Sequence, residues 1–521
     1  MISAAILLTS QALLAQQSFQ RALTEPTLYG YMVGIDTTAD GGCVFLERET
    51  AADGNYNVIV GKVDSTGGLA WSFRLDNVVE DLAWNVTSLS DGGVLLVCSD
   101  GYDVTPVDDL ELVRLNDQGQ ITWSKRYLAP AYGHFYLRQV HERPGTSTIQ
   151  VYGSLWSNTL PEPHGIVLNL DANGHLLTQC RFVTTDSSDF VQDALPLPNG
   201  DHLILSHFGG REVSGYRVAH LDSAFHVITN TAWRMPGALD LVPERMSFAM
   251  DGSLFITGSL HDHNDGGPEG SVFIAADSSG RPLSVQRIPM FNAQLAFLGP
   301  GRPVQRADAH WYVAHGGDPS AIILELGSDG TAISTNTLLG ITGADGILRA
   351  DRQGRIWSAT SRSTPYMAVV SRFADLASTS CGTLTAPLVS NAVGLEPVNM
   401  PLTVLGPLNI QEQDIVWSAT RLMDWEALCG STGLVAEGPD DVTALFLWPD
   451  PASDHCRIKL AQQDAGSLSV CDPTGRVVLV QPYGAGVAEL TIDVSAWPNG
   501  LYLVQDRRPD GCHTVRVMVA H

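Results

Sequence analysis

The sequence lacks the short motifs that usually mark a catalytic or metal site. It contains no Cys-x-x-Cys, no Gly-x-Ser-x-Gly and no His-Glu-x-x-His. It also has no Walker loop and no dinucleotide-binding fingerprint after a strand. These absences remove the zinc-ribbon, thioredoxin and nucleotide-binding classes. We therefore predict a protein that is not an enzyme and that requires no cofactor.

Basic residues are scarce: 30 Lys and Arg face 56 Asp and Glu, which gives a net charge of −26. Nucleic acids and anionic lipid surfaces attract proteins through a basic footprint, so this balance argues against both as partners. No apolar run approaches the length of a membrane helix, so we expect no transmembrane segment in the mature chain.

The N-terminal residues 1–15 have the pattern of a signal peptide. The segment from Ala4 to Ala15 is mostly apolar, and Leu13-Leu14-Ala15 is an acceptable small-residue cleavage site before Gln16. The usual positive region is missing, because no Lys or Arg precedes Arg21. The apolar run is too short to anchor the chain in a bilayer, so we expect export.

A repeated turn dominates the larger part of the chain. It begins with Lys62-Val63-Asp64-Ser65-Thr66-Gly67, and equivalent third positions follow at 116, 171, 222, 277 and 327, in steps of 52, 55, 51, 55 and 50. A weaker copy, Ser371-Arg372-Phe373-Ala374, adds a step of 47. A period near fifty residues indicates a repeat array and is one standard length of a propeller blade.

A second turn precedes the first in most repeats, as in Asp40-Gly41-Gly42 and Asp91-Gly92-Gly93. Asp-Gly between alternating apolar runs favours a hairpin, so each repeat supplies four strands. We predict an all-β fold with a seven-bladed β-propeller over 22–376, although degenerate turns leave six or eight blades open. We expect the segment before Tyr29 to supply the missing strand of the last blade. The repeats resemble blades that are common in exported Bacteroidetes proteins.

The last part of the chain contains four ordered turn and strand motifs. Two prolines flank Asp450, a Gly-Arg turn leads into a strand, a Pro-x-Gly-x-Tyr hairpin follows, and the final strand is basic. This order closely resembles the type A C-terminal sorting domain of the type IX secretion system of Bacteroidetes, over 445–521. The matching positions are Pro449, Pro451, Gly475, Arg476, Pro498, Gly500 and Tyr502.

The resemblance implies a route and a partner. It predicts Sec export, passage through the outer membrane by the type IX machinery, and removal of a small β-sandwich sorting domain. The protein would then be secreted or attached to the outer surface. Residues 377–444, rich in Pro and Gly, would form a linker or a small connecting subdomain.

Few residues have the potential to bind a metal or to form a disulfide. His261, His263 and Asp265 lie in one Gly-rich loop and are a candidate transition-metal site. Oxygen ligands for calcium are available from Asp100, Asp103, Asp108 and Asp109. Cys381 and Cys429 bracket the connecting segment and are a candidate disulfide. The repeated turn aspartates fit caps of turns better than ligands.

Three functional classes are compatible with the sequence. The first is a propeller that binds a protein, glycan or surface ligand through its loop faces. The second is a surface polysaccharide hydrolase or lyase, whose paired acids would converge over the channel without leaving a linear motif. The third is a structural or adhesive surface protein. Trp71 and Trp123 favour packing between blades over a ligand-stacking platform.

Overall fold

The structure is a computed structural model, and it describes most of the chain as strands and turns. The described residues are 19–23, 29–50, 56–76, 81–100, 109–130, 134–143, 145–156, 163–184, 188–209, 214–237, 239–262, 268–289, 300–315, 320–339, 342–351, 355–363, 366–373, 383–385, 390–405, 408–422, 425–429, 446–448, 452–460, 465–471, 477–498, 500–508 and 511–519.

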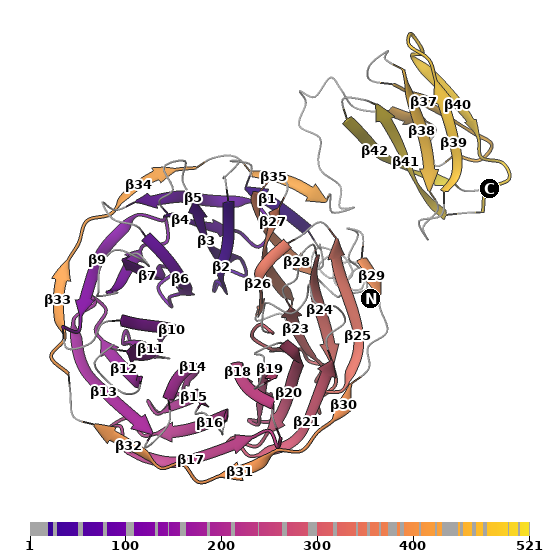
Figure 1. The fold of residues 1–521 in the computed structure, drawn as a ribbon. Helices are drawn as coiled ribbons and strands as arrows, with labels where there is room; N and C mark the ends of the chain where they lie inside the picture. The colour runs from indigo at the N-terminus through magenta and orange to yellow at the C-terminus, as the bar shows by residue number, and fades with distance from the viewer. Residues whose placement is uncertain are drawn as a thin grey trace, which may run out of the picture. The chain divides into compact units, whose positions relative to one another are not determined.

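Seven five-stranded antiparallel sheets are arranged in a ring, as in a β-propeller (Figure 1). Blades are numbered here in chain order, and in blades 1 to 6 four consecutive strands run from the inside of the ring outward. Blades 1 to 3 contain β2 (Tyr29–Thr37), β3 (Cys43–Thr50), β4 (Tyr56–Val63), β5 (Leu69–Asp76); β6 (Asp81–Ser88), β7 (Val94–Asp100), β8 (Leu110–Leu115), β9 (Ile121–Leu128); β10 (His134–Glu142), β11 (Ile149–Trp156), β12 (His164–Leu170) and β13 (Leu176–Thr184). Blades 4 to 6 contain β14 (Ser188–Pro196), β15 (His202–Gly209), β16 (Ser214–Leu221), β17 (Val227–Arg234); β18 (Leu239–Phe248), β19 (Leu254–Asp262), β20 (Pro268–Ala276), β21 (Pro282–Pro289); β22 (Val304–Gln305), β23 (Trp311–His315), β24 (Ser320–Leu326) and β25 (Ala332–Leu339).

The N-terminal strand closes the ring, which confirms the prediction. Among the described residues, blade 7 has three consecutive strands of its own, β26 (Thr342–Ala350), β27 (Ile356–Ser363) and β28 (Tyr366–Phe373). Its fourth is β1 (Phe19–Leu23), which pairs antiparallel with β28. The two ends of the repeat array are thus joined within one sheet.

The fifth strand of every blade comes from one later segment, which we call the belt (383–429). The expected linker or connecting subdomain is not what this part of the chain forms. The belt runs once around the rim in the reverse order of the blades, from blade 6 to blade 1 and then to blade 7 (Figure 1). Its strands are β29 (Thr383–Thr385), β30 (Asn391–Ala392), β31 (Glu396–Val398), β32 (Leu402–Leu405), β33 (Gln411–Asp414), β34 (Ser418–Arg421) and β35 (Trp425–Cys429).

Two kinds of contact hold the belt in place. Its short strands pair with the outermost blade strands, which would otherwise expose unpaired backbone groups. Between these strands, apolar side chains enter the clefts between blades, where Trp417 and Leu422 are buried. The apolar positions recur every six or seven residues, at Leu395, Leu402, Leu408, Ile415 and Leu422.

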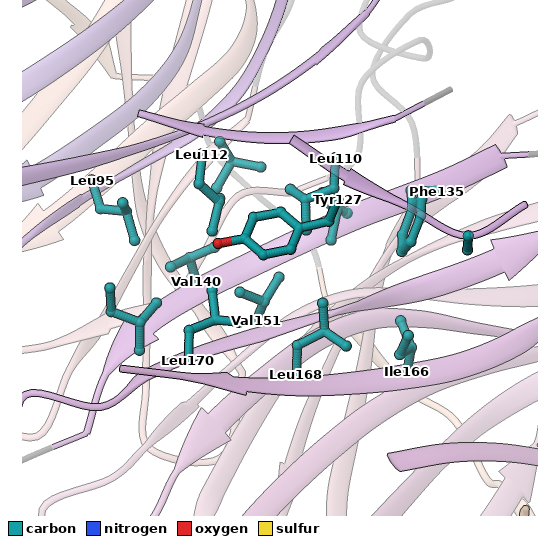
Figure 2. Close-up of a cluster of buried hydrophobic side chains, with 14 of the residues drawn as sticks. Leu95, Leu110, Leu112, Tyr127, Phe135, Val140, Val151, Ile166, Leu168 and Leu170 are labelled. Atoms are coloured by element: carbon teal, nitrogen blue, oxygen red, sulfur yellow. The ribbon is translucent and has the colours of Figure 1, made fainter. Parts of the chain in front are cut away.

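The hydrophobic core lies between neighbouring blades. Figure 2 shows the cluster between blades 2 and 3, where the ring of Tyr127 lies among leucine and valine side chains from both sheets. The hydroxyl of Tyr127 also donates a hydrogen bond to the carbonyl of Gly174 in the next blade. Each blade therefore stabilises its neighbours, as expected for radial repetition.

The repeated turns explain the fifty-residue signature. In the first five copies, the Oδ1 atom of the Asp or Asn accepts hydrogen bonds from backbone N–H groups two and four residues later, as Asp277 does from Ser279 (2.9 Å) and Arg281 (3.0 Å). The fourth residue of the turn has a positive φ and is usually Gly. In the fourth copy Phe225 takes this position with a φ of 67°, and its ring stacks on His202.

The C-terminal residues form a separate compact unit, 433–521. One sheet has the order β36 (Phe446–Trp448), β37 (His455–Lys459), β40 (Glu489–Asp493). The other has the order β39 (Val477–Tyr483), β38 (Gly466–Cys471), β41 (Gly500–Arg508), β42 (Gly511–Val519). Apolar residues of both sheets, including Ile458 and Val504, form a core of their own, so this unit is a small β-sandwich.

Candidate functional site

A β-bulge interrupts the innermost strand of each of the first five blades at the same height. The registers shift at Met32/Gly34, Ala83/Asn85, Leu137/Gln139, Val191/Asp193 and Pro243/Arg245. A bulge leaves one residue outside the ladder and redirects its side chain. The residues left out in blades 1, 2, 3 and 5 are Val33, Trp84, Arg138 and Glu244, and all four line one cavity.

This cavity of about 190 Å³ lies at the centre of the ring. Its wall is built from β2, β3, β6, β10, β18, β26 and the segment before β22, so six of the seven blades contribute. Five arginines reach it, whereas Glu244 is the one carboxylate among the lining residues that the structure describes. The arginines are Arg48, Arg138, Arg245, Arg302 and Arg349.

Two further carboxylates contact arginines of the cavity but are not themselves lining residues. Asp193 of blade 4 forms an ion pair with Arg302 of blade 6 and also accepts a hydrogen bond from the N–H of Met246 (2.7 Å). Asp36 lies 3.7 Å from the Nε atom of Arg349. Among the described residues, Asp193 and Asp36 thus contact two of the five arginines, and Glu244 lines the cavity beside them.

The positive charges influence one another. Burial lowers the pKa of Arg349 to about 10, and the charges of Arg302 and Arg245 act in the same direction. At neutral pH Arg349 therefore remains charged. Burial also lowers the pKa of His141 to about 4, with Arg302 as the next cause. A concave site lined by several guanidinium groups attracts anions, and low-dielectric walls strengthen the attraction.

The rest of the wall is aromatic and polar. Trp84 is 36% exposed, and its Nε1 atom donates a hydrogen bond to Ser99 Oγ (2.8 Å). Asn85 donates through Nδ2 to Gln139 Oε1 (3.1 Å) and thereby joins the inner strands of blades 2 and 3. An apolar ring surface beside a few oriented polar groups is typical of a small-ligand site.

The residues proposed as a metal site are only partly described. His261 Nε2 lies 3.1 Å from Ser259 Oγ, whereas His263 and Asp265 lie outside the described residues. Within the described part of the chain, no group of three His, Cys, Asp or Glu side chains is arranged to hold a metal ion. Both the transition-metal site and the calcium site remain predictions, because Asp103 and Asp108 are also outside.

The other predicted residues fall into two groups. Trp71 and Trp123 pack between blades: each donates from Nε1 to a turn carbonyl of the next blade, Asp117 or Ala172, at 2.9 Å. The candidate disulfide lies outside what the structure describes, because Cys381 is not described and of Cys429 only the backbone is.

Where the sorting motif predicted a hairpin, the C-terminal sandwich has a connection between its two sheets, because β40 and β41 belong to different sheets and do not pair. Tyr502 donates a hydrogen bond from its hydroxyl to the carbonyl of Pro498 (2.9 Å), and its ring lies 4.9 Å from that of Trp497. Gly500 begins β41. Pro449, Pro451, Gly475 and Arg476 are outside the described residues.

Residues 446–520 match the family described as "Secretion system C-terminal sorting domain". The chain carries a type IX sorting domain. The sorting domain directs the protein through the type IX secretion system to the cell surface or beyond. No helix among the described residues has the length and apolar character needed to cross a membrane.

Comparison with other proteins finds distant similarities. No curated protein matches the chain in sequence. The β-propeller domain of the Trilobed protease from Pyrococcus furiosus is similar at 9% identity and a TM-score of 0.38, covering 67% of this chain and 95% of that one. Regucalcin from Agrobacterium tumefaciens, a calcium-binding protein, has 12% identity and a TM-score of 0.32, with 68% and 94% covered. The polysaccharide lyase Uly1 has 8% identity and a TM-score of 0.41, with 66% of this chain and 90% of that one covered. Such low values support no functional argument.

The sequence analysis missed the arginine-lined cavity. Its arginines are not close in sequence, and the ring brings them together. A signal was present, because Arg245, Arg302 and Arg349 follow one another at 57 and 47 residues, close to the blade period. Charged residues that recur at the start of successive repeats predict a shared position on one face of the array.

Proposed function

We propose that the protein is an exported binding protein whose propeller takes up an anionic ligand in the central cavity. The observation that carries this proposal is the cluster of five arginines in a chain with a net charge of −26. Most of the surface repels anions, so the cavity is a local exception. Guanidinium groups hold carboxylates, sulfates and phosphates through paired hydrogen bonds.

The geometry supports binding over the two alternatives. A hydrolase or lyase of the kind considered above would show paired acids at the channel, whereas among the described lining residues one carboxylate stands among five arginines. A structural or adhesive spacer requires no concave polar site, and this propeller has one.

Binding of simple anions by the full chain tests the proposal. Calorimetry at low ionic strength, with citrate as the probe and spermidine as the cationic comparison, should show saturable binding of citrate alone. Arg245→Met should weaken citrate binding at least fivefold. Arg234→Met is the matched control, because Arg234 pairs with Glu396 of the belt on the rim (3.0 Å) and should leave binding unchanged. Equal loss in both variants, or no citrate binding, would contradict the proposal.

A further inference from the structure

We infer that the ligand is an acidic sugar unit, a hexuronate or a sulfated hexose, bound at the end of a glycan chain. The inference rests on the proposed anion site and adds the class of molecule that carries the anion. Three observations lead to it: an exposed indole in the wall, polar groups beside it, and the small size of the cavity within an acidic protein.

Trp84 is positioned as a platform for a sugar ring. It is the residue that the bulge of β6 leaves out of the ladder, and it lines the cavity together with the arginines. Its Nε1–H is already bonded to Ser99 Oγ, so the indole is held in one orientation with its polar atom satisfied. What it offers to the cavity is therefore ring surface, which suits the C–H face of a pyranose better than a small inorganic anion.

Polar groups surround this platform. Asn85 follows Trp84 directly, and its amide is tied to Gln139. Arg138 lies next to Gln139 on β10, and Arg245 enters from β18. The amide of Asn85 is fully used within the wall, because its Nδ2 atom donates to Arg138 O and Gln139 Oε1 and its Oδ1 atom accepts from the N–H of Val86. The groups offered to a ligand are therefore the guanidinium groups, whose N–H donors match both sugar hydroxyls and an acidic substituent. An inorganic anion would use the arginines alone and leave the aromatic wall without a role.

Size and charge restrict the ligand to a chain end. The volume of about 190 Å³ is below the roughly 300–1,000 Å³ of pockets that enclose drug-sized ligands. The cavity therefore suits one monosaccharide unit. A longer acidic chain must lie along the outside of a protein with a net charge of −26, where it is repelled. A terminal unit can enter while the rest of the glycan points away into solvent.

Calorimetry with four probes on the full chain tests the acidic-sugar ligand separately from the anion site. The probes are citrate, galacturonate, galactose 6-sulfate and galactose. We expect galacturonate or galactose 6-sulfate to bind and galactose not to bind. Trp84→Leu, which keeps an apolar side chain, should weaken the acidic sugar at least fivefold and change citrate binding less than twofold. Arg245→Met should weaken both, and Arg234→Met neither.

The results distinguish a wrong ligand class from a wrong binding site. If citrate binds but Trp84→Leu affects neither acidic sugar, the sugar inference is wrong and the anion site stands. If no anion binds, both are wrong. Whether the site binds the terminal unit of a glycan is tested by comparing trigalacturonate with polygalacturonate at equal uronate concentration. Binding that follows the concentration of chain ends supports the terminal unit, whereas binding that follows total uronate overturns it.

Discussion

Lys125 on β9 and Glu412 on the belt strand β33 form an ion pair, with 2.6 Å between Nζ and Oε1. His175 of the next blade also contacts Glu412, with 2.7 Å between Nδ1 and Oε1. Lys125 is nearly buried, and its Nζ is 3.0 Å from Asp414 Oδ1 as well. One belt carboxylate thus joins blades 2 and 3 across their cleft, so the belt binds neighbouring blades to each other as well as covering their edges.

Replacement of Glu412 by Gln should destabilise the propeller by about 1–2 kcal/mol, because partly buried hydrogen bonds to a charged group are lost. Glu396→Gln is the matched control, since its partner Arg234 is exposed and such pairs contribute about 0–1 kcal/mol. Thermal unfolding at pH 7 measures both. Equal midpoints for the two variants would show that the Glu412 contacts do not hold the belt.

The pair of Lys125 and Glu412 makes the stability of the propeller depend on pH in the acidic range. Burial alone would raise the pKa of Glu412, but hydrogen bonds from Lys125 and His175 outweigh it, and the pKa is lowered. A carboxylate whose pKa is lower in the folded state contributes stability above its unfolded pKa of 4.5, and this is lost as the pH falls through the folded value. The difference between wild type and Glu412→Gln should therefore shrink below pH 4.5. A difference that stays constant down to pH 3 would contradict the assignment.

Glu47 predicts a dependence of the opposite sign. This residue on β3 is 1% exposed, and neither carboxylate oxygen has a hydrogen-bond partner. Burial, followed by the charge of Glu49, raises its pKa to about 8. The folded state then holds a proton that the unfolded state loses above pH 4.5, so stability falls as the pH rises from 4.5 to 8. Glu47→Met should flatten this decline, as measured by thermal midpoints from pH 5 to 9. An unchanged slope would show that Glu47 is not the group responsible.

His202 makes the propeller sensitive to mild acid. Its Nδ1 atom lies 2.8 Å from the hydroxyl of Tyr152, and its Nε2 atom is buried without a partner. Burial lowers the pKa of His202 to about 4. Between pH 6.5 and 4 the unfolded state takes up a proton that the folded state does not, so stability falls by about 1.4 kcal/mol per pH unit. His202→Asn should reduce this slope in urea unfolding at pH 7, 6 and 5. An equal slope in wild type and His202→Asn would show that His202 is already protonated in the folded state.

The ring was predictable because its local signals repeat. Asp-Gly turns, alternating apolar strands and a fifty-residue period each point to the same blade, and the closure by β1 follows from the strand that blade 7 lacks. The belt was not predictable in the same way. Its strands are two to five residues long and gain stability only from the edges they cover, so their own sequence carries almost no strand signal.

The site escaped sequence analysis for a related reason. Turn residues are chosen by local backbone geometry, whereas Trp84 and Arg245 are brought together by bulges in strands about 160 residues apart. The residues that were predicted as a metal site, His261 and its neighbours, were selected because they are close together in the sequence. Where function is assembled across blades, the period of a residue type is more informative than its local density.

Deletion of 445–521 should separate export from folding. The sorting domain has its own sheets and its own core, and the propeller with its belt forms a compact unit that ends before 433. In a host with a type IX system, the truncated chain should therefore accumulate in the periplasm and keep the protease resistance of the full-length propeller. Cell fractionation followed by limited proteolysis tests both points. Tyr502→Ala in the full-length chain is the finer variant, because it removes the bond to Pro498 and leaves the propeller intact. Truncated protein at the surface or in the medium would refute the sorting role, and a truncated propeller that is digested in the periplasm would refute its independence.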